Sequence, residues 1–285
     1  MKKLALILFL LLLGTAVCRA QKFDSTRTVT ITLTDDTEIT GKIIAKDSVN
    51  TTIRTLMGVV SVVPNKKISK VEKLKGSVVR GEYYPPDPSE NRLFLMPTAR
   101  PLKMGETQFN AVEIFFPHLI FGVTDFINLG LGGMPFVASG GGTFVYYLSA
   151  KITPVNVEQA AFSLGGAMIG ATSSEVIVGI GYALGTFGTK TASFTIGPLF
   201  GFSQDEVFDR PAFLLGGSAR ISRATSFISE NIFLFGNDTK DFTMFPSIGI
   251  RFAGEHLAAD FGTYAIVAGD DFFYPIPWIG LSYKF

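Results

Sequence analysis

The chain has 285 residues, of which 47% are hydrophobic, including 27 phenylalanines, and its formal net charge is +1. A charge this close to zero, without a basic patch, argues against a nucleic-acid-binding protein. After the N-terminus no apolar run is long enough to cross a membrane as a helix, so the apolar residues must be carried by strands.

The first 20 residues have the order of a secretory signal peptide. Two lysines precede the apolar run 4–13, small residues follow it, and cleavage is expected after Ala20. Cys18 is the one cysteine, and the bulky Val17 before it argues against lipidation. The mature chain is therefore expected to be exported and to contain no disulfide.

Residues 21–80 predict a small periplasmic β-domain. Turn residues separate five runs rich in Thr, Val and Ile, which predict strands over 29–34, 38–46, 49–55, 59–63 and 68–74. Five short strands in so few residues indicate a barrel-like arrangement. The stretch 32–43 resembles the opening of an Sm-like or SH3-like fold. Such folds often bind RNA, but the aromatic and basic loop residues for this are missing, so a structural or partner-docking role is expected.

Residues 81–91 form a proline-rich linker, with three prolines within positions 85–88. From residue 92 to the end, apolar residues alternate with small, polar or charged ones, as in strands that face lipid on one side and a hydrated lumen on the other. The pattern predicts an all-β fold with an antiparallel transmembrane barrel. Twelve strands are expected, over 92–99, 107–123, 126–134, 143–153, 159–171, 175–187, 190–203, 211–222, 225–236, 242–252, 256–267 and 276–285.

The connections between these strands alternate between short turns and longer, more acidic loops, as in barrels with short periplasmic turns and longer outer loops. With an even strand number, the start of the first barrel strand and the end of the last one are both on the periplasmic side. Because prolines interrupt the first two predicted strands, ten strands with residues 91–104 as a plug or lead-in is the alternative. Around residue 180 the pattern predicts that Tyr182 and Leu184 face lipid and that Gly179, Gly181 and Gly185 face the lumen.

The last strand shows the alternation most clearly, and it ends on Phe285. One face carries Ile279, Leu281, Tyr283 and Phe285, and the other carries Trp278, Gly280, Ser282 and Lys284. The aromatic face resembles the C-terminal assembly signal that the barrel-assembly machinery recognises in outer-membrane proteins. Replacing Leu281 with arginine is expected to impair assembly, and the same change at Ser282 is expected to be tolerated better.

Six charged side chains are expected to face the lumen: Lys151, Arg220, Glu230, Arg251, Asp260 and Lys284. A tight turn at 254–255 would make Arg251 and Asp260 diagonal neighbours on adjacent strands, so we expect them to pair. The acidic residues of the outer loops (205, 206, 209, 238, 241, 270 and 271) have no metal-ligand spacing and are expected to be solvated.

The segments 95–101 and 122–132, with the sequences LMPTARP and GVTDFINLGLG, together resemble an uncharacterised family of outer-membrane β-barrel proteins from Bacteroidota-type bacteria. The resemblance covers residues 90–285 approximately. It implies a fold and a location in the cell outer membrane, and it transfers no catalytic residue.

Two functions compete at this point. The first is a passive pore for small solutes with a periplasmic accessory domain, and the second is an anchor that docks a periplasmic or envelope protein. An outer-membrane hydrolase is a third class, but no catalytic motif accompanies His118 or His256, so no enzyme, catalytic residue, metal or cofactor is expected. The expected partners are outer-membrane lipid, the assembly machinery and a periplasmic protein, without nucleic acid.

Overall fold

The computed structural model describes residues 28–73, 76–79, 82–113, 115–138, 141–172, 174–204, 206–210, 212–236, 243–268 and 271–285. The predicted signal peptide lies outside these residues. The chain divides into two compact units at Pro86, with Gln21–Pro86 in one unit and Asp87–Phe285 in the other. Each unit is described by itself.

The unit Gln21–Pro86 contains a five-stranded antiparallel sheet with the order β4-β3-β2-β1-β5. Its strands are β1 (Thr28–Leu33), β2 (Glu38–Lys46), β3 (Asn50–Thr55), β4 (Val60–Pro64) and β5 (Ile68–Lys73), so each predicted strand is present. Ile31, Ile53 and Val63 form its buried core. A hairpin of β6 (Ser77–Val79) and β7 (Glu82–Tyr84) was not predicted, and β7 occupies part of the expected linker. The Sm-like assignment stays a prediction.

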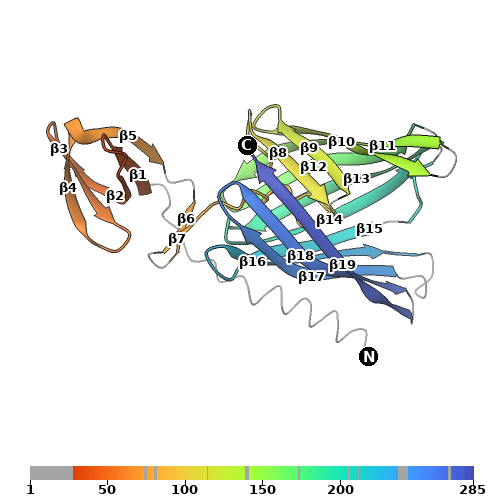
Figure 1. Cartoon of the computed structure of the whole chain (residues 1–285). Coiled ribbons are helices and arrows are strands. Elements are labelled where there is room, and N and C mark those ends of the chain that lie inside the picture. Colours follow the sequence, from red (N-terminus) through yellow and green to blue (C-terminus); the bar gives the residue numbers. More distant parts are fainter. Residues whose placement is uncertain are drawn as a thin grey trace, which may run out of the picture. The chain divides into compact units, whose positions relative to one another are not determined.

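The unit Asp87–Phe285 is an antiparallel barrel that twelve strands of the described chain close (Figure 1). The strands are β8 (Thr107–Val112), β9 (Phe116–Gly122), β10 (Ile127–Ala138), β11 (Gly141–Val157), β12 (Ala160–Ala171), β13 (Ser174–Gly188), β14 (Ala192–Ser203), β15 (Ala212–Arg220), β16 (Thr225–Leu234), β17 (Thr243–Ala253), β18 (Leu257–Ala268) and β19 (Asp271–Lys284). The first and last strands pair with each other, which closes the ring. The all-β, antiparallel, twelve-stranded prediction is confirmed.

The first two strand predictions were wrong, although the total is right. Residues 92–99 form no strand, and the single strand expected over 107–123 is two strands, β8 and β9. Between them Glu113 has a φ of 50°, a left-handed conformation that a continuing strand cannot contain. Pro97 and Pro101 lack the amide hydrogens of a paired strand and lie in the segment that precedes the barrel.

The outer surface of the barrel is apolar and largely solvent-accessible, while the opposite face of each strand is buried. On β19, Leu281 and Tyr283 are exposed, whereas Ser282 between them is 0% exposed. Phe162, Phe187 and Phe194 form a contiguous outward aromatic group on β12, β13 and β14. This arrangement is the one that a lipid-embedded barrel presents.

Strand β13 reverses the predicted faces. Tyr182 and Leu184 are buried and belong to the core inside the barrel. Outward-facing Gly179 and Gly185 are covered by aromatic rings, since a Cβ at either position would lie within 3 Å of Phe202 or Phe187. The glycines are therefore required where neighbouring outward aromatic side chains need room.

No helix in the described part of the chain is both long and apolar enough to cross a membrane.

Candidate functional site

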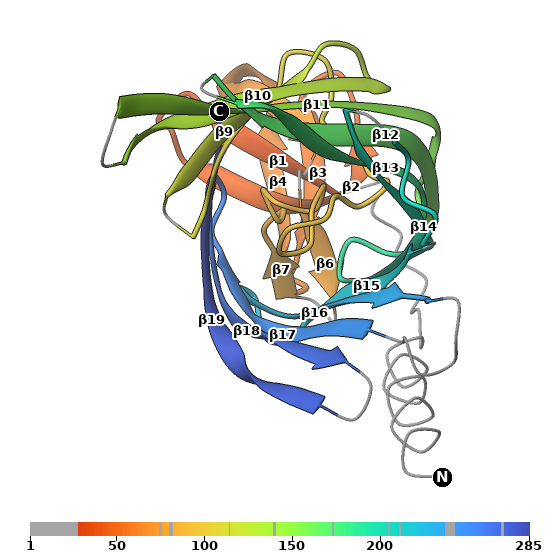
Figure 2. The same ribbon diagram turned by 90° about the vertical axis from the view of Figure 1, so that its right-hand side faces the viewer.

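Residues 87–104, here called the luminal segment, run inside the barrel as far as Leu102, and Lys103 and Met104 at its end are exposed. Figure 2 looks along the barrel, and the strands form a ring around this segment. The segment folds back on itself: the Leu93 amide donates to the Met96 carbonyl, and the Thr98 amide donates to the Asn91 carbonyl. Most of its side chains between positions 88 and 102 are buried. A plug was predicted only for the alternative barrel of ten strands. The structure combines such a plug with twelve strands.

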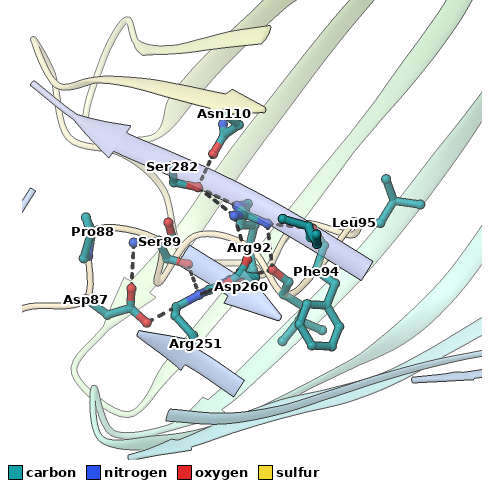
Figure 3. Close-up of polar contacts among 12 residues, drawn as sticks. Asp87, Pro88, Ser89, Arg92, Phe94, Leu95, Asn110, Arg251, Asp260 and Ser282 are labelled. Carbon is teal, nitrogen blue, oxygen red and sulfur yellow. Dashed lines mark hydrogen bonds and ion pairs between the residues drawn. The ribbon is translucent and has the colours of Figure 1, made fainter. Parts of the chain in front are cut away.

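Two arginines and two aspartates hold the N-terminal end of the luminal segment to the wall (Figure 3). Arg251 of β17 contacts Asp260 of β18 through Nε at 2.6 Å and Nη2 at 3.1 Å. Arg92 of the segment approaches the same carboxylate at 2.7 Å, and Asp87 lies 3.4 Å from Arg251 Nη1. The formal charges of these four groups cancel, which offsets part of the cost of burying them.

Arg251 also binds the main chain of the luminal segment. It donates to the carbonyls of Ser89, Arg92 and Leu93 at 2.8, 3.2 and 2.7 Å. Its planar guanidinium has five N–H donors, so one side chain can satisfy a carboxylate and several carbonyls at once. The inward face of β19 contributes Ser282, whose hydroxyl oxygen accepts from Arg92 Nε and Nη2.

Glu230 of β16 binds the turn at the tip of the segment. Its Oε2 accepts three consecutive amide hydrogens, from Phe94, Leu95 and Met96, at 2.9, 3.1 and 3.0 Å. Its Oε1 accepts from the Tyr264 hydroxyl at 2.5 Å. Charge-assisted bonds of this kind are about twice as strong as neutral ones. The carboxylate therefore fixes both the position and the backbone conformation of the tip.

The second half of the segment is held by the opposite wall. Lys151 Nζ on β11 donates to the carbonyls of Thr98 and Arg100 at 3.1 and 2.6 Å. Ala99 donates its amide hydrogen to Thr186 Oγ1 and accepts at its carbonyl from Thr153 Oγ1. Further along, Asn128 binds both the amide and the carbonyl of Leu102, and Arg100 donates to the Gly188 carbonyl. The polar side chains of the wall thus hydrogen-bond mainly to the main chain of the segment.

Apolar side chains of the segment fill the lumen beside these polar contacts. Leu93, Phe94 and Met96 pack in one buried cluster with wall residues from β12 to β16, including Leu184, Leu199, Leu214 and Ile228. Phe94 also contacts the rings of Tyr264 and Trp278 edge-on or tilted. At this level the interior is a packed core.

The structure brings together four of the six charges predicted for the lumen, Lys151, Glu230, Arg251 and Asp260, all buried around the segment. Arg251 and Asp260 pair as expected, but directly opposite each other rather than diagonally. The other two lie at strand ends: Arg220 donates to the Arg223 carbonyl in the next turn, and Lys284 pairs with Glu106 at 2.9 Å.

No group of three or more His, Cys, Asp and Glu side chains in the described residues could hold a metal ion. Of the acidic loop positions, 205, 238, 241 and 270 lie outside the described residues. His118 contacts the Phe116 carbonyl and the Tyr147 ring, and His256 Nδ1 donates to the Lys284 carbonyl. Among described residues neither imidazole contacts a serine or a carboxylate.

Several residues that form the site were not selected from the sequence. Arg92, Asp87 and Ser89 lie in the segment itself, and Asn128 and Thr186 lie in the wall. The available signal was the concentration of polar residues and prolines at 87–101, in front of strands whose inward faces carry isolated charges.

No protein-family model matches the chain, and no curated protein matches it in sequence. Among solved structures, the KdgM porin in complex with disordered oligogalacturonate is 9% identical, covers 63% of this chain and 98% of its own, and has a TM-score of 0.46. A loop-deletion mutant of OmpT, an outer membrane protein of Vibrio cholerae, is 11% identical and has a TM-score of 0.35. The match covers 91% of this chain and 96% of the OmpT chain. The closed antiparallel barrel of the present chain is defined by its own strand pairing.

Proposed function

We propose that this chain is an outer-membrane channel for small solutes whose lumen is closed by residues 87–104 and opens when this segment moves aside. In a closed barrel every strand is hydrogen-bonded to a neighbour on both sides, so no unpaired edge faces the lipid. The apolar outer surface is suited to the hydrocarbon of a membrane. Export by the N-terminal signal would bring the chain to the periplasm. The even strand number would then place the start of the first barrel strand, the end of the last one and the Gln21–Pro86 unit on the periplasmic side. This unit would be the accessory domain.

The carrying observation is that charged groups, rather than apolar packing alone, hold the segment. Glu230, Lys151 and the Arg251–Asp260 pair all face the lumen and are nine-tenths or more buried. In a permanently filled interior such groups cost free energy that apolar residues of similar size would avoid. In a lumen that becomes hydrated, water solvates them as soon as the segment leaves. The wall is thus suited to both a closed and an open state.

An anchoring protein is the second candidate. The apolar contacts of Leu93, Phe94 and Met96 with the wall favour it, because they stabilise the filled barrel. In that function the barrel stays closed, and the Gln21–Pro86 unit holds a periplasmic or envelope protein. The hydrolase alternative has no supporting contact at either histidine in the described residues.

A reversible disulfide between the segment and the wall tests the channel. Leu93 packs against Gly216, where an added Cβ would lie 2.4 Å from Leu93 Cδ1, so Leu93→Cys with Gly216→Cys brings a segment thiol and a wall thiol close together. The new Cβ would also lie 2.8 Å from the Ser229 carbonyl oxygen, so the folding of each variant is checked before conductance is measured. The processed chain would have no other cysteine. In planar bilayers we expect conductance steps from the reduced double variant and none from the oxidised form.

Each single-cysteine variant serves as a control and should conduct whatever the redox state. Equal conductance from the oxidised and reduced double variant would reject the segment as the gate. Silence of wild type and all variants, together with a periplasmic protein that is retained by the Gln21–Pro86 unit, would favour the anchor.

A further inference from the structure

Two charges on opposite walls of the barrel have no oppositely charged side chain as partner in the described residues. The ammonium group of Lys151 donates to two carbonyls of the luminal segment, and the Glu230 carboxylate accepts three of its amide hydrogens and one tyrosine hydroxyl. The dipoles of the segment therefore solvate one isolated cation and one isolated anion. The other buried wall charges, Arg251 and Asp260, neutralise each other.

These two charges bind parts of the luminal segment that are two residues apart. Glu230 binds the Met96 amide and Lys151 binds the Thr98 carbonyl, each within about 3.1 Å. Three extended residues span at most about 11 Å, so the two charged groups are no more than roughly 17 Å apart. Their strands, β11 and β16, stand five positions apart in a ring of twelve, which places them on nearly opposite walls.

We propose that, in the open channel, Lys151 and Glu230 form a transverse pair of pore charges that selects small zwitterions, such as free amino acids, over uncharged solutes of the same size. The inference rests on the proposed channel function. When the segment leaves, its dipoles leave with it, and the wall presents a cation and an anion to the solute. A solute with one carboxylate and one ammonium can align with this field, as charged side chains in pores bias what passes.

A role in the open channel also explains why these two side chains are charged, although among the described residues their charged groups bind only the main chain of the segment and a tyrosine hydroxyl. A neutral donor or acceptor would bind a carbonyl or an amide without the cost of burying a charge. Arg251 and Asp260 keep each other as partners in both states, so they add no net charge to the open pore. The selectivity is therefore assigned to Lys151 and Glu230 rather than to the larger cluster shown in Figure 3.

Swelling of liposomes that contain the full chain tests the proposal. The rates for L-serine, a zwitterion, and erythritol, an uncharged polyol, are measured for each variant, and their ratio is compared. A ratio is needed because Lys151→Met and Glu230→Gln both loosen the segment and raise the two rates together. Glu255→Gln, in an exposed turn, is the matched control.

We expect wild type and Glu255→Gln to favour serine, and each single variant to lose this preference. The exchange Lys151→Glu with Glu230→Lys reverses the field but keeps its size, so it should restore the preference, since a zwitterion can turn around. Swelling with no preference in wild type, or a ratio that neither single substitution changes, would overturn the inference and leave the channel standing. Absence of swelling with both solutes would overturn the channel and the inference together.

Discussion

Arg251 and Asp260 face each other directly across β17 and β18, and their side chains form a two-point ion pair inside the barrel. The same carboxylate is shared with Arg92 of the luminal segment at 2.7 Å. Asp260 thus pairs with both a wall arginine and a segment arginine. One carboxylate therefore contributes both to the hold on the N-terminal end of the segment and to the stability of this part of the wall.

Asp260→Asn should lower the stability of the barrel strongly. Removing one member of a buried ion pair costs about 3–5 kcal/mol, because the partner charge stays buried without compensation. The measurement is the urea concentration at which heat-modifiable migration on SDS gels is lost. Asp209→Asn, at an exposed loop position, is the control and should match wild type. A midpoint for Asp260→Asn equal to that of the control would contradict the buried pair.

Glu230→Gln should free the tip of the luminal segment without unfolding the barrel. The substitution removes the charge that three amides donate to, and hydrogen bonds to charged groups contribute about 1.5–3 kcal/mol. Hydrogen exchange followed by mass spectrometry should show amides 94–96 exchanging about tenfold faster or more, with the strand amides unchanged. Unaltered protection at 94–96, relative to Glu255→Gln, would mean that apolar packing alone holds the tip.

The strands could be predicted because successive side chains of a strand point to opposite faces, so apolar and polar residues alternate along the sequence. Ten of the twelve predicted barrel strands, and all five of the first unit, lie within a few residues of the observed ones. The predicted alternation of short turns and longer loops holds only in part: eight residues separate β14 from β15 and β16 from β17, but only two separate β10 from β11 and β18 from β19. For Arg251 and Asp260 the hairpin turn between them was enough to predict their pairing.

Alternation does not say which face is inside when the interior is itself apolar. Leu184 and Tyr182 were assigned to lipid because they are apolar or aromatic, but Leu93 and Phe94 of the luminal segment provide an apolar environment within the barrel. The segment could not be placed by periodicity, since its prolines and its tight turn give it none. Its contacts with Glu230 are to the main chain, which no side-chain pattern records.

Arginine substitutions on β19 distinguish the two faces of the barrel, with a revised expectation for the inner one. Leu281→Arg places a charge on the lipid face, which costs about 2–4 kcal/mol near the middle of the membrane, and should reduce the folded yield in lipid vesicles. Ser282 is fully buried and accepts two hydrogen bonds from Arg92, so arginine at this position is expected to disturb the luminal segment rather than the insertion of the barrel.

Ser282→Arg would bring a second guanidinium against Arg92 and displace the segment, while the barrel still inserts. Limited proteolysis of the inserted protein should therefore cut within residues 87–104 in this variant and not in wild type. Ser282→Ala, which only removes the hydroxyl, should insert with the wild-type yield and stay protected. Equal insertion yields for Leu281→Arg and Ser282→Arg would contradict the assignment of faces.

Asp47, in the turn between β2 and β3, should titrate below the usual range for an aspartate. The Asn50 and Val49 amides donate to its Oδ1 at 2.6 and 2.7 Å, and these backbone bonds lower its pKa because they stabilise the charged form. A carboxylate with a lowered folded-state pKa stabilises the fold above its unfolded pKa of about 3.9, and this contribution is lost as the pH falls through the folded value. An NMR titration of the Asp47 side-chain carboxyl carbon in the full chain should give a midpoint below 3.9. A midpoint at or above that of an unfolded peptide would show that the two amides do not hold the carboxylate.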